Sequence, residues 1–213
     1  MQRVIISRPW WQQQEAKIMK IIILGGFLGS GKTTVLLKLA KELSLMSKLK
    51  TPVAIIENEI GDVSVDTSLL GGYEIRELFS GCICCTLAGD LTVAANEIKE
   101  KYDPEYLIIE ATGVAQPLNI IKIMEQYADA EDITSVVLCD AYRWDELMDY
   151  MDVFISNQLK GAKIVLLNKC DLVDTETAEK AASEIAEMNK EAKIFKISAI
   201  GDDLWVKSIK EVL

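Results

Sequence analysis

Residues 20–34 read KIIILGGFLGSGKTT, an apolar run that passes directly into a glycine-rich loop and the start of a helical pattern. Positions 26–33 match G-x-x-x-x-G-K-[ST], in which backbone N–H groups and the following helix N-terminus surround phosphates. Lys32 is expected to reach the β- and γ-phosphates of a nucleotide, and the Thr33 hydroxyl to bind Mg²⁺. The expected phosphate-binding residues are Gly26, Gly29, Ser30, Gly31, Lys32, Thr33 and Thr34.

Apolar, β-branched runs continue along the chain and alternate with longer stretches of helical period. This alternation is typical of β-α-β units, and near-continuous apolarity indicates strands buried on both faces. The expected strands are Lys20–Leu24, Val53–Glu57, Tyr106–Glu110, Ile133–Cys139, Lys163–Asn168 and Lys193–Ile197. The expected helices are Thr33–Ser47, Leu87–Tyr102, Pro117–Ala128, Met151–Leu159, Thr175–Lys190 and Asp203–Val212. The sequence therefore predicts an α/β fold, the three-layer αβα sandwich of P-loop NTPases with a mostly parallel central sheet.

The interval 58–86 breaks this alternation. It contains the pair Gly71-Gly72, a short strand-like piece at 73–79 and the cluster Gly81-Cys82-Ile83-Cys84-Cys85. Long irregular insertions in a compact domain are usually functional, so we expect this interval to carry a second part of the site.

Composition limits the partners. The chain has 213 residues, a formal net charge of −10 and a pI near 4.7. Such a chain offers no basic surface to a nucleic acid or an anionic membrane, so neither is expected as a partner. The apolar runs are of strand length, far short of the roughly 20 residues that a membrane helix needs.

The domain organisation follows from length and from the N-terminal segment. Half of the residues are apolar, which suits one full-sized core, and we assign the domain to residues 19–213. Residues 1–18 lack the apolar core of a signal peptide; we expect an arm without a function of its own, or a consequence of start-codon choice with Met19 as the true start.

The five cysteines are spaced poorly for disulfides, so a cytoplasmic protein with reduced thiols is expected.

A second motif selects the base. Asn168-Lys169-Cys170-Asp171 follows a buried strand, where ligand-binding loops of parallel sheets gather. The Asp171 carboxylate can accept hydrogen bonds from guanine N1–H and the exocyclic amine, which adenine lacks there, while Lys169 can lie along the base plane. Ser198 and Ala199 follow the last strand, where a backbone contact to guanine O6 is expected. The motif predicts GTP and GDP rather than ATP.

The third expected strand ends in a carboxylate. In Glu110-Ala111-Thr112-Gly113, Glu110 would hold a Mg²⁺-bound water and the Gly113 N–H would sense the γ-phosphate. Catalysis would then consist of positioning and electrostatics around an in-line attack by water, with Lys32, Thr33, Glu110 and Gly113 as the catalytic set. The four arginines include none in an arginine-finger motif, so slow intrinsic turnover is expected.

The cysteine cluster suits a soft metal. Cys82, Cys84 and Cys85 place three thiols within four residues, which can supply two or three ligands to Zn²⁺ or a related transition metal such as Co²⁺ or Ni²⁺. The chain has no histidine, so a further ligand must be another residue type. The alternative is that these cysteines are small buried hydrophobes; Cys139 and Cys170 are assigned to packing.

Together these motifs resemble the CobW-like metal-chaperone GTPases, which belong with the urease and hydrogenase accessory GTPases. The resemblance extends from Met19 to the end of the sequence, and G-C-x-C-C is its discriminating element. The motifs that carry it are the loop at 25–34, Glu57-Asn58-Glu59-Ile60-Gly61-Asp62, Gly81-Cys82-Ile83-Cys84-Cys85, Glu110-Ala111-Thr112-Gly113-Val114-Ala115-Gln116-Pro117 and Asn168-Lys169-Cys170-Asp171.

The resemblance implies a GTP-gated metal carrier. Glu59 or Asp62 would add an oxygen ligand to the cysteines and couple the metal to the nucleotide. A client metalloprotein or corrinoid protein and a GTP-dependent homodimer are the implied partners. Longer members continue into a second domain and many have a histidine-rich segment; this sequence has neither pattern, so the GTPase domain itself, a homodimer partner or a separate protein is expected to dock the client.

Two other functions fit parts of this pattern. A GTP-dependent recruitment switch for a metalloenzyme or corrinoid protein would use the cysteines only for a structural ion. A small-molecule kinase would use the same P-loop, but such enzymes usually close arginine-bearing lids and have no need of N-K-x-D.

Overall fold

The centre of the structure is a seven-stranded sheet in the order β3-β2-β4-β1-β5-β6-β7. The computed structural model describes residues 19–46, 51–57, 74–77, 88–126, 132–201, 204–210 and 212–213. Every strand pairing in these ranges is parallel. The predicted α/β fold is confirmed, and the sheet is parallel throughout rather than mostly parallel.

The predicted elements recur with adjusted ends. The strands are β1 (Lys20–Gly26), β2 (Val53–Glu57), β3 (Glu74–Glu77), β4 (Tyr106–Glu110), β5 (Asp132–Asp140), β6 (Ile164–Asn168) and β7 (Lys193–Lys196). The helices are α1 (Lys32–Met46), α2 (Ala88–Tyr102), α3 (Pro117–Glu125), α4 (Trp144–Leu159), α5 (Thr175–Met188) and α6 (Leu204–Lys210), with a 3₁₀ turn at Cys170–Leu172. The strand-like piece predicted at 73–79 supplies β3 at the sheet edge.

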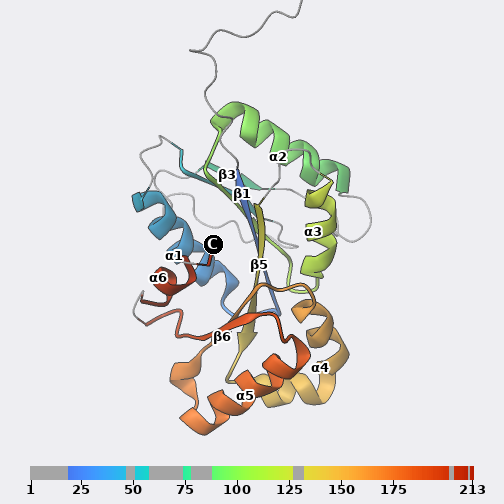
Figure 1. Ribbon diagram of the computed structural model, residues 1–213, viewed down its shortest axis with the longest axis vertical. Coiled ribbons are helices and arrows are strands. Elements are labelled where there is room, and N and C mark those ends of the chain that lie inside the picture. Colours follow the sequence, from blue (N-terminus) through green and yellow to red (C-terminus); the bar gives the residue numbers. More distant parts are fainter. Residues whose placement is uncertain are drawn as a thin grey trace, which may run out of the picture.

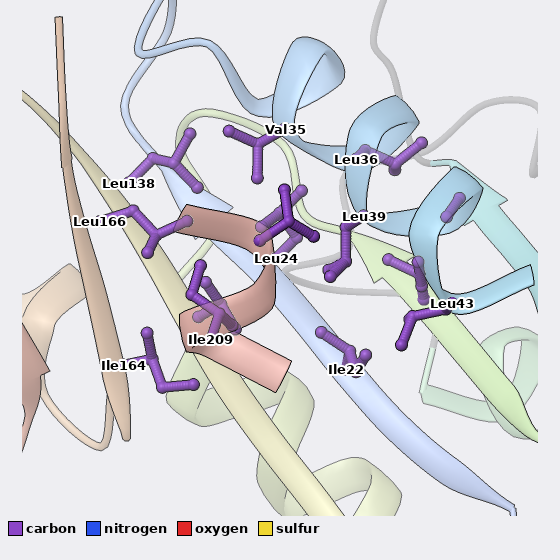
Figure 2. Packing of buried hydrophobic residues seen from close by; sticks show 14 of the residues in the cluster. Ile22, Leu24, Val35, Leu36, Leu39, Leu43, Leu138, Ile164, Leu166 and Ile209 are labelled. Carbon is purple, nitrogen blue, oxygen red and sulfur yellow. The ribbon is translucent and has the colours of Figure 1, made fainter. Parts of the chain in front are cut away.

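Helices cover both faces of the sheet, as Figure 1 shows. Alternate residues of a strand point to opposite faces, so Ile22 and Leu24 of β1 pack with α1 and α6. Figure 2 shows this cluster, with Leu39 and Leu43 of α1 meeting the sheet residues. These two helices form the first outer layer.

The other face carries α2, α3, α4 and α5. Ile21 and Ile23 of β1 pack with α2 and α3, while Val137 and Val165 pack with α4 and α5. The four central strands of the sheet, β4, β1, β5 and β6, are therefore buried on both faces, which explains their near-continuous apolar sequences. The result is the predicted three-layer sandwich.

Helix α4 begins earlier than the sequence predicts. It starts at Trp144 instead of Met151, and Met151 itself has φ −140° and ψ 24°, outside the helical range. The first half was missed because the helical pattern is interrupted at this kink. Trp144 is only 1% exposed and its Nε1 donates to Glu184 Oε2 of α5 at 2.7 Å, which anchors the first half.

The strand register brings polar residues to one edge. Leu24 of β1 pairs with Glu110 of β4, and Gly26 of β1 pairs with Leu138 of β5. In the next pairing of the sheet, Asp140 of β5 pairs with Asn168 of β6. Because all these strands are parallel, their carboxyl ends gather around the loop that follows β1.

Truncation of Leu166 tests the core. This residue is fully buried in β6 and packs in the cluster of Figure 2, so Leu166→Ala should lower the free energy of unfolding by about 2–5 kcal/mol. Leu45 is 72% exposed on α1, and Leu45→Ala should change it by less than about 0.5 kcal/mol. Urea denaturation followed by circular dichroism measures both; equal effects would contradict the packing.

Candidate nucleotide-binding site

The loop between β1 and α1 has a backbone that requires glycine at two contact points. Gly26 has φ 136° and Gly31 has φ 99°, a region that other residues rarely adopt. A Cβ on Gly26 would lie 2.5 Å from the Leu138 carbonyl oxygen, and one on Gly31 would lie 2.4 Å from Asn168 Nδ2. The loop is therefore pressed against β5 and β6, with no room for a side chain at either position.

Lys32 and Thr33 extend from the first turn of α1. Lys32 is 8% exposed, and its Nζ donates to the carbonyl oxygens of Gly26 at 3.1 Å and Phe27 at 3.3 Å. Thr33 Oγ1 donates to Glu110 Oε1 at 3.4 Å, although the two residues are 77 positions apart in the chain. A cation, a hydroxyl and a carboxylate thus meet at the start of one helix.

These groups lie at a cleft with a volume of about 470 Å³. Gly113 lies against the phosphate loop, since a Cβ there would be 2.9 Å from the Leu28 backbone nitrogen. The cleft is lined by Phe27, Leu28, Gly29, Gly31, Lys32, Thr33, Thr34, Glu110, Ala111, Thr112, Gly113 and Val114. All four predicted catalytic residues are therefore brought together at one cleft.

Asn168 joins the two nucleotide motifs. It is 3% exposed, its Nδ2 donates to the Ser30 carbonyl oxygen at 2.8 Å, and its Oδ1 accepts from the Ala199 N–H at 2.8 Å. The predicted base-reading segments are thereby held beside the phosphate loop. Asp171 lies exposed in the 3₁₀ turn that follows, and Ser198 is half-buried next to Ala199.

Asp140 is a residue of this candidate site that sequence reasoning missed. Its side chain is fully buried at the end of β5; it accepts from Lys169 Nζ at 2.7 Å, Arg143 Nε at 2.8 Å and the Tyr142 N–H at 3.1 Å. Lys169 has a left-handed backbone with φ 65°, which turns its side chain back toward this carboxylate. A carboxylate at the end of a buried strand was the available signal, as it was for Glu110.

Arg143 extends this network to the phosphate loop. Its Nε binds Asp140, and its Nη2 donates to the Leu28 carbonyl oxygen at 2.7 Å. Asp140 is fully buried, whereas the Lys169 and Arg143 side chains are about 30% exposed, so both cations reach the buried carboxylate from the surface. One buried carboxylate therefore fixes both the lysine of the base-reading motif and the loop that faces the phosphates.

Comparison with known proteins agrees with this geometry. The family model described as "CobW/HypB/UreG, nucleotide-binding domain" matches residues 20–196. The chain belongs to the CobW/HypB/UreG family. The match begins with β1 and ends with β7, so the whole sheet falls within the nucleotide-binding domain of this family.

Two relatives of this CobW/HypB/UreG chain have zinc in their names. It is 33% identical to "Zinc chaperone YjiA" of Escherichia coli (strain K12), over 84% of this chain and 57% of the relative. It is 28% identical to "Zinc-regulated GTPase metalloprotein activator 1" of Dictyostelium discoideum, over 84% of this chain and 45% of that protein. The chain spans about half the length of the curated relatives it matches.

Solved structures show the same fold. Zn(II)-bound YjiA GTPase from E. coli superposes with a TM-score of 0.63 at 28% identity, over 88% of this chain and 60% of that one. Hydrogenase maturation factor HypB from Archaeoglobus fulgidus superposes with a TM-score of 0.65 at 17% identity, over 92% of this chain and 91% of that one. The second likeness concerns the fold alone.

The predicted transition-metal ligands of this CobW/HypB/UreG domain lie outside the described residues. They are Glu59, Asp62, Cys82, Cys84 and Cys85. Within the described part of the chain, no group of three cysteine, aspartate or glutamate side chains could hold a metal ion, and no helix is long and apolar enough to cross a membrane. Cys139 is buried and Cys170 half-buried against the α4–α5 core, in agreement with the packing role predicted for both.

Thiol reactivity should separate Cys139 from the other cysteines. Burial, and secondarily the Asp140 carboxylate, raises the pKa of the Cys139 thiol from 9.0 to about 12. At pH 8 only about one thiol in 10⁴ is then ionised, so Cys139 should stay unmodified by iodoacetamide while the unfolded chain is fully labelled. Burial also raises the pKa of Cys170, which is half-buried and should react sooner.

The same shift gives a pH dependence. A raised folded-state pKa means that the stability from keeping the Cys139 thiol neutral is complete below pH 9 and is lost as the pH rises toward 12. Pulsed alkylation with peptide mass spectrometry at pH 8 and pH 10 measures the labelling rates, and urea denaturation at the same two pH values measures the stability. Labelling of Cys139 at the unfolded rate in the native protein would contradict its burial.

Proposed function

We propose that this domain binds and slowly hydrolyses GTP, and that it uses the nucleotide to control delivery of a transition metal to a client metalloprotein or corrinoid protein. The observation that carries the proposal is the Asn168 bridge, which joins the guanine-reading motif to the phosphate loop by bonds of 2.8 Å on each side. The names of the zinc-chaperone relatives support the metal part.

The nucleotide would lie along the carboxyl edge of the sheet. Guanine would bind between Lys169 and the Ser198–Ala199 backbone, with Asp171 accepting its N1–H and amine hydrogens. The phosphates would follow the Gly26–Thr34 loop toward Lys32, whose ammonium already faces two loop carbonyls. A site built to pair the guanine donors rejects adenine, because the polar groups would otherwise remain unpaired.

Residues suited to Mg²⁺ are present. Thr33 Oγ1 and Glu110 Oε1 are 3.4 Å apart at the cleft, and Mg²⁺ prefers such hard oxygen donors. Thr33 would ligate the ion and Glu110 would hold one of its waters. The bound ion would neutralise charge on the β- and γ-phosphates.

Hydrolysis in the isolated domain should be slow. Lys32 would stabilise the charge that develops on the γ-phosphate, and the Gly113 N–H would contact it. Arg143 is held by Asp140 and Leu28 rather than directed into the cleft, so it does not supply an arginine finger. Dimerisation, metal or a client would therefore accelerate turnover.

The metal itself is cargo. Cys82, Cys84 and Cys85 would bind Zn²⁺, Co²⁺ or Ni²⁺ as thiolates, with Glu59 or Asp62 as an oxygen ligand. Metal release would follow the change of nucleotide, because the same stretch of chain would contact both.

Exchange of Asp171 tests the base. Asp171→Asn should lower GTP affinity about 10–100-fold, because a hydrogen bond to a charged group contributes about 1.5–3 kcal/mol. The same variant should bind xanthosine triphosphate more tightly than the parent does, since the new amide can donate to the xanthine 2-oxygen. Displacement of a fluorescent nucleotide measures both affinities.

The matched control is Asp174→Asn. Asp174 is exposed three positions away, where its side chain accepts from the Thr177 N–H and caps α5, and asparagine caps helices equally well. This variant should keep the parent's nucleotide preference. If Asp171→Asn also kept it, the N-K-x-D assignment would be wrong.

Metal affinity tests the second half of the proposal. Binding of Zn²⁺, Co²⁺ and Ni²⁺ should differ between the complexes with a non-hydrolysable GTP analogue and with GDP. The Cys84→Ser/Cys85→Ser variant should lose about 100-fold or more in affinity, since two thiolates are removed. Cys170→Ser, which changes a half-buried thiol that lies against the α4–α5 core, should leave metal affinity unchanged. Tight binding that ignores the nucleotide would favour the recruitment switch instead.

A further inference from the structure

Gln158 is a buried polar residue that the proposed chemistry does not use. It lies in the second half of α4 and is 1% exposed. Its Nε2 donates to the Gly113 carbonyl oxygen at 2.9 Å and to the Ala115 carbonyl oxygen at 3.4 Å. One side chain thus holds two carbonyls of the loop that follows β4.

This loop is enclosed on two sides. Gly113 is pressed against the phosphate loop at Leu28, and its carbonyl is held from the other side by Gln158. The Ala111 N–H donates to the Leu24 carbonyl at 2.9 Å, which fixes the start of the loop to β1. Fixing the Gly113 carbonyl restrains the residue with the greatest backbone freedom in this segment.

The same half of α4 also contacts the phosphate loop. The Phe154 ring meets Phe27 edge-to-face, with ring centroids 5.8 Å apart. Phe154 and Gln158 are four positions apart and lie on one side of the helix. The second half of α4 therefore contacts both loops that line the cleft, beyond the kink at Met151 that separates it from the half anchored by Trp144.

An apolar residue would fill this position at lower cost if packing were its only role. Burial of an amide is unfavourable unless its hydrogen bonds are made, and here they are made to the Gly113 and Ala115 carbonyls, which an apolar side chain would leave without these donors. We therefore attribute the amide at position 158 to its hydrogen bond with the Gly113 carbonyl rather than to packing in the surrounding core.

We propose that Gln158 is a positioning residue for γ-phosphate readout: it holds the loop at 111–116 in the arrangement in which the Gly113 N–H can contact the third phosphate. The inference rests on the proposed function, since it assumes that GTP binds in this cleft. Gln158 does not line the cleft, so it would act on the nucleotide only through Gly113. Its loss should weaken GTP binding and hydrolysis selectively, because GDP has no third phosphate for the Gly113 N–H to contact.

The variant Gln158→Met tests this, because it keeps the length of the side chain and removes both donors. Affinity for a non-hydrolysable GTP analogue should fall about tenfold while GDP affinity stays within about twofold of the parent. The hydrolysis rate at saturating GTP should fall as well. Isothermal titration with both nucleotides and a single-turnover phosphate-release assay measure these quantities.

Asn189 offers a matched control. Its Nδ2 also donates to two backbone carbonyls, of Leu159 at 2.8 Å and Ala162 at 2.9 Å, at and just beyond the C-terminal end of α4, and neither residue lines the cleft. Asn189→Leu should lower the melting temperature and leave the ratio of GTP to GDP affinity unchanged. A purely structural role for Gln158 would give the same result in Gln158→Met, and that result would overturn the proposal.

Hydrogen exchange on the unmodified protein gives an independent test. Amides at 111–116 and 152–159 should gain protection together when GDP is replaced by the GTP analogue, while those at 144–150 should not. Protection that changes at 111–116 but not at 152–159 would overturn the role of Gln158. A parent protein that binds neither guanine nucleotide would instead refute the proposed function, and the inference with it.

Discussion

The position of β1 is the constraint on which the site depends. The strand is buried on both faces and paired on both edges, by β4 and β5, so neither its direction nor its register can change without loss of the core. Its carboxyl end must therefore deliver the glycine loop between the ends of its neighbours. This fixes Glu110 on one side of the loop and Asp140 on the other.

Buried polar side chains mark the same edge of the sheet. Of the eight that are buried among the described residues, six lie at or against the nucleotide loops: Ser30, Lys32, Glu110, Asp140, Gln158 and Asn168. Burying such groups is unfavourable unless they are paired, and all six except Ser30, whose Oγ has no partner among the described residues, make hydrogen bonds or ion pairs; their concentration here reflects a requirement other than stability. The pairing in turn makes the loops stiff, and a stiff cleft can distinguish a third phosphate from a second.

The sequence predicted the parts of this site that are local. A strand, a glycine loop and a helix occupy fifteen consecutive residues, and the N-K-x-D motif occupies four. The contacts between motifs could not be predicted from the sequence, because they join residues that are far apart in the chain. Arg143 and Leu28 are separated by 115 positions, and Asn168 and Ser30 by 138. Gln158 gave no signal at all, since a single glutamine in an amphipathic helix is ordinarily a surface residue. Such contacts are set by the strand order, which periodicity does not reveal.

Strand order also bears on how metal and nucleotide could be coupled. Glu57 at the end of β2 pairs with Glu110 at the end of β4, and Glu77 at the end of β3 pairs with Glu57. The chain positions that follow these two strand ends are those of the predicted metal ligands, which begin at Glu59 and at Cys82. The carboxyl ends of β2 and β3 thus lie at the same edge of the sheet as that of β4, where Thr33 and Glu110 meet. The ends of β4, β2 and β3 are consecutive neighbours in the sheet, so a change at Glu110 is separated from the end of β3 by the width of two strands rather than by the core.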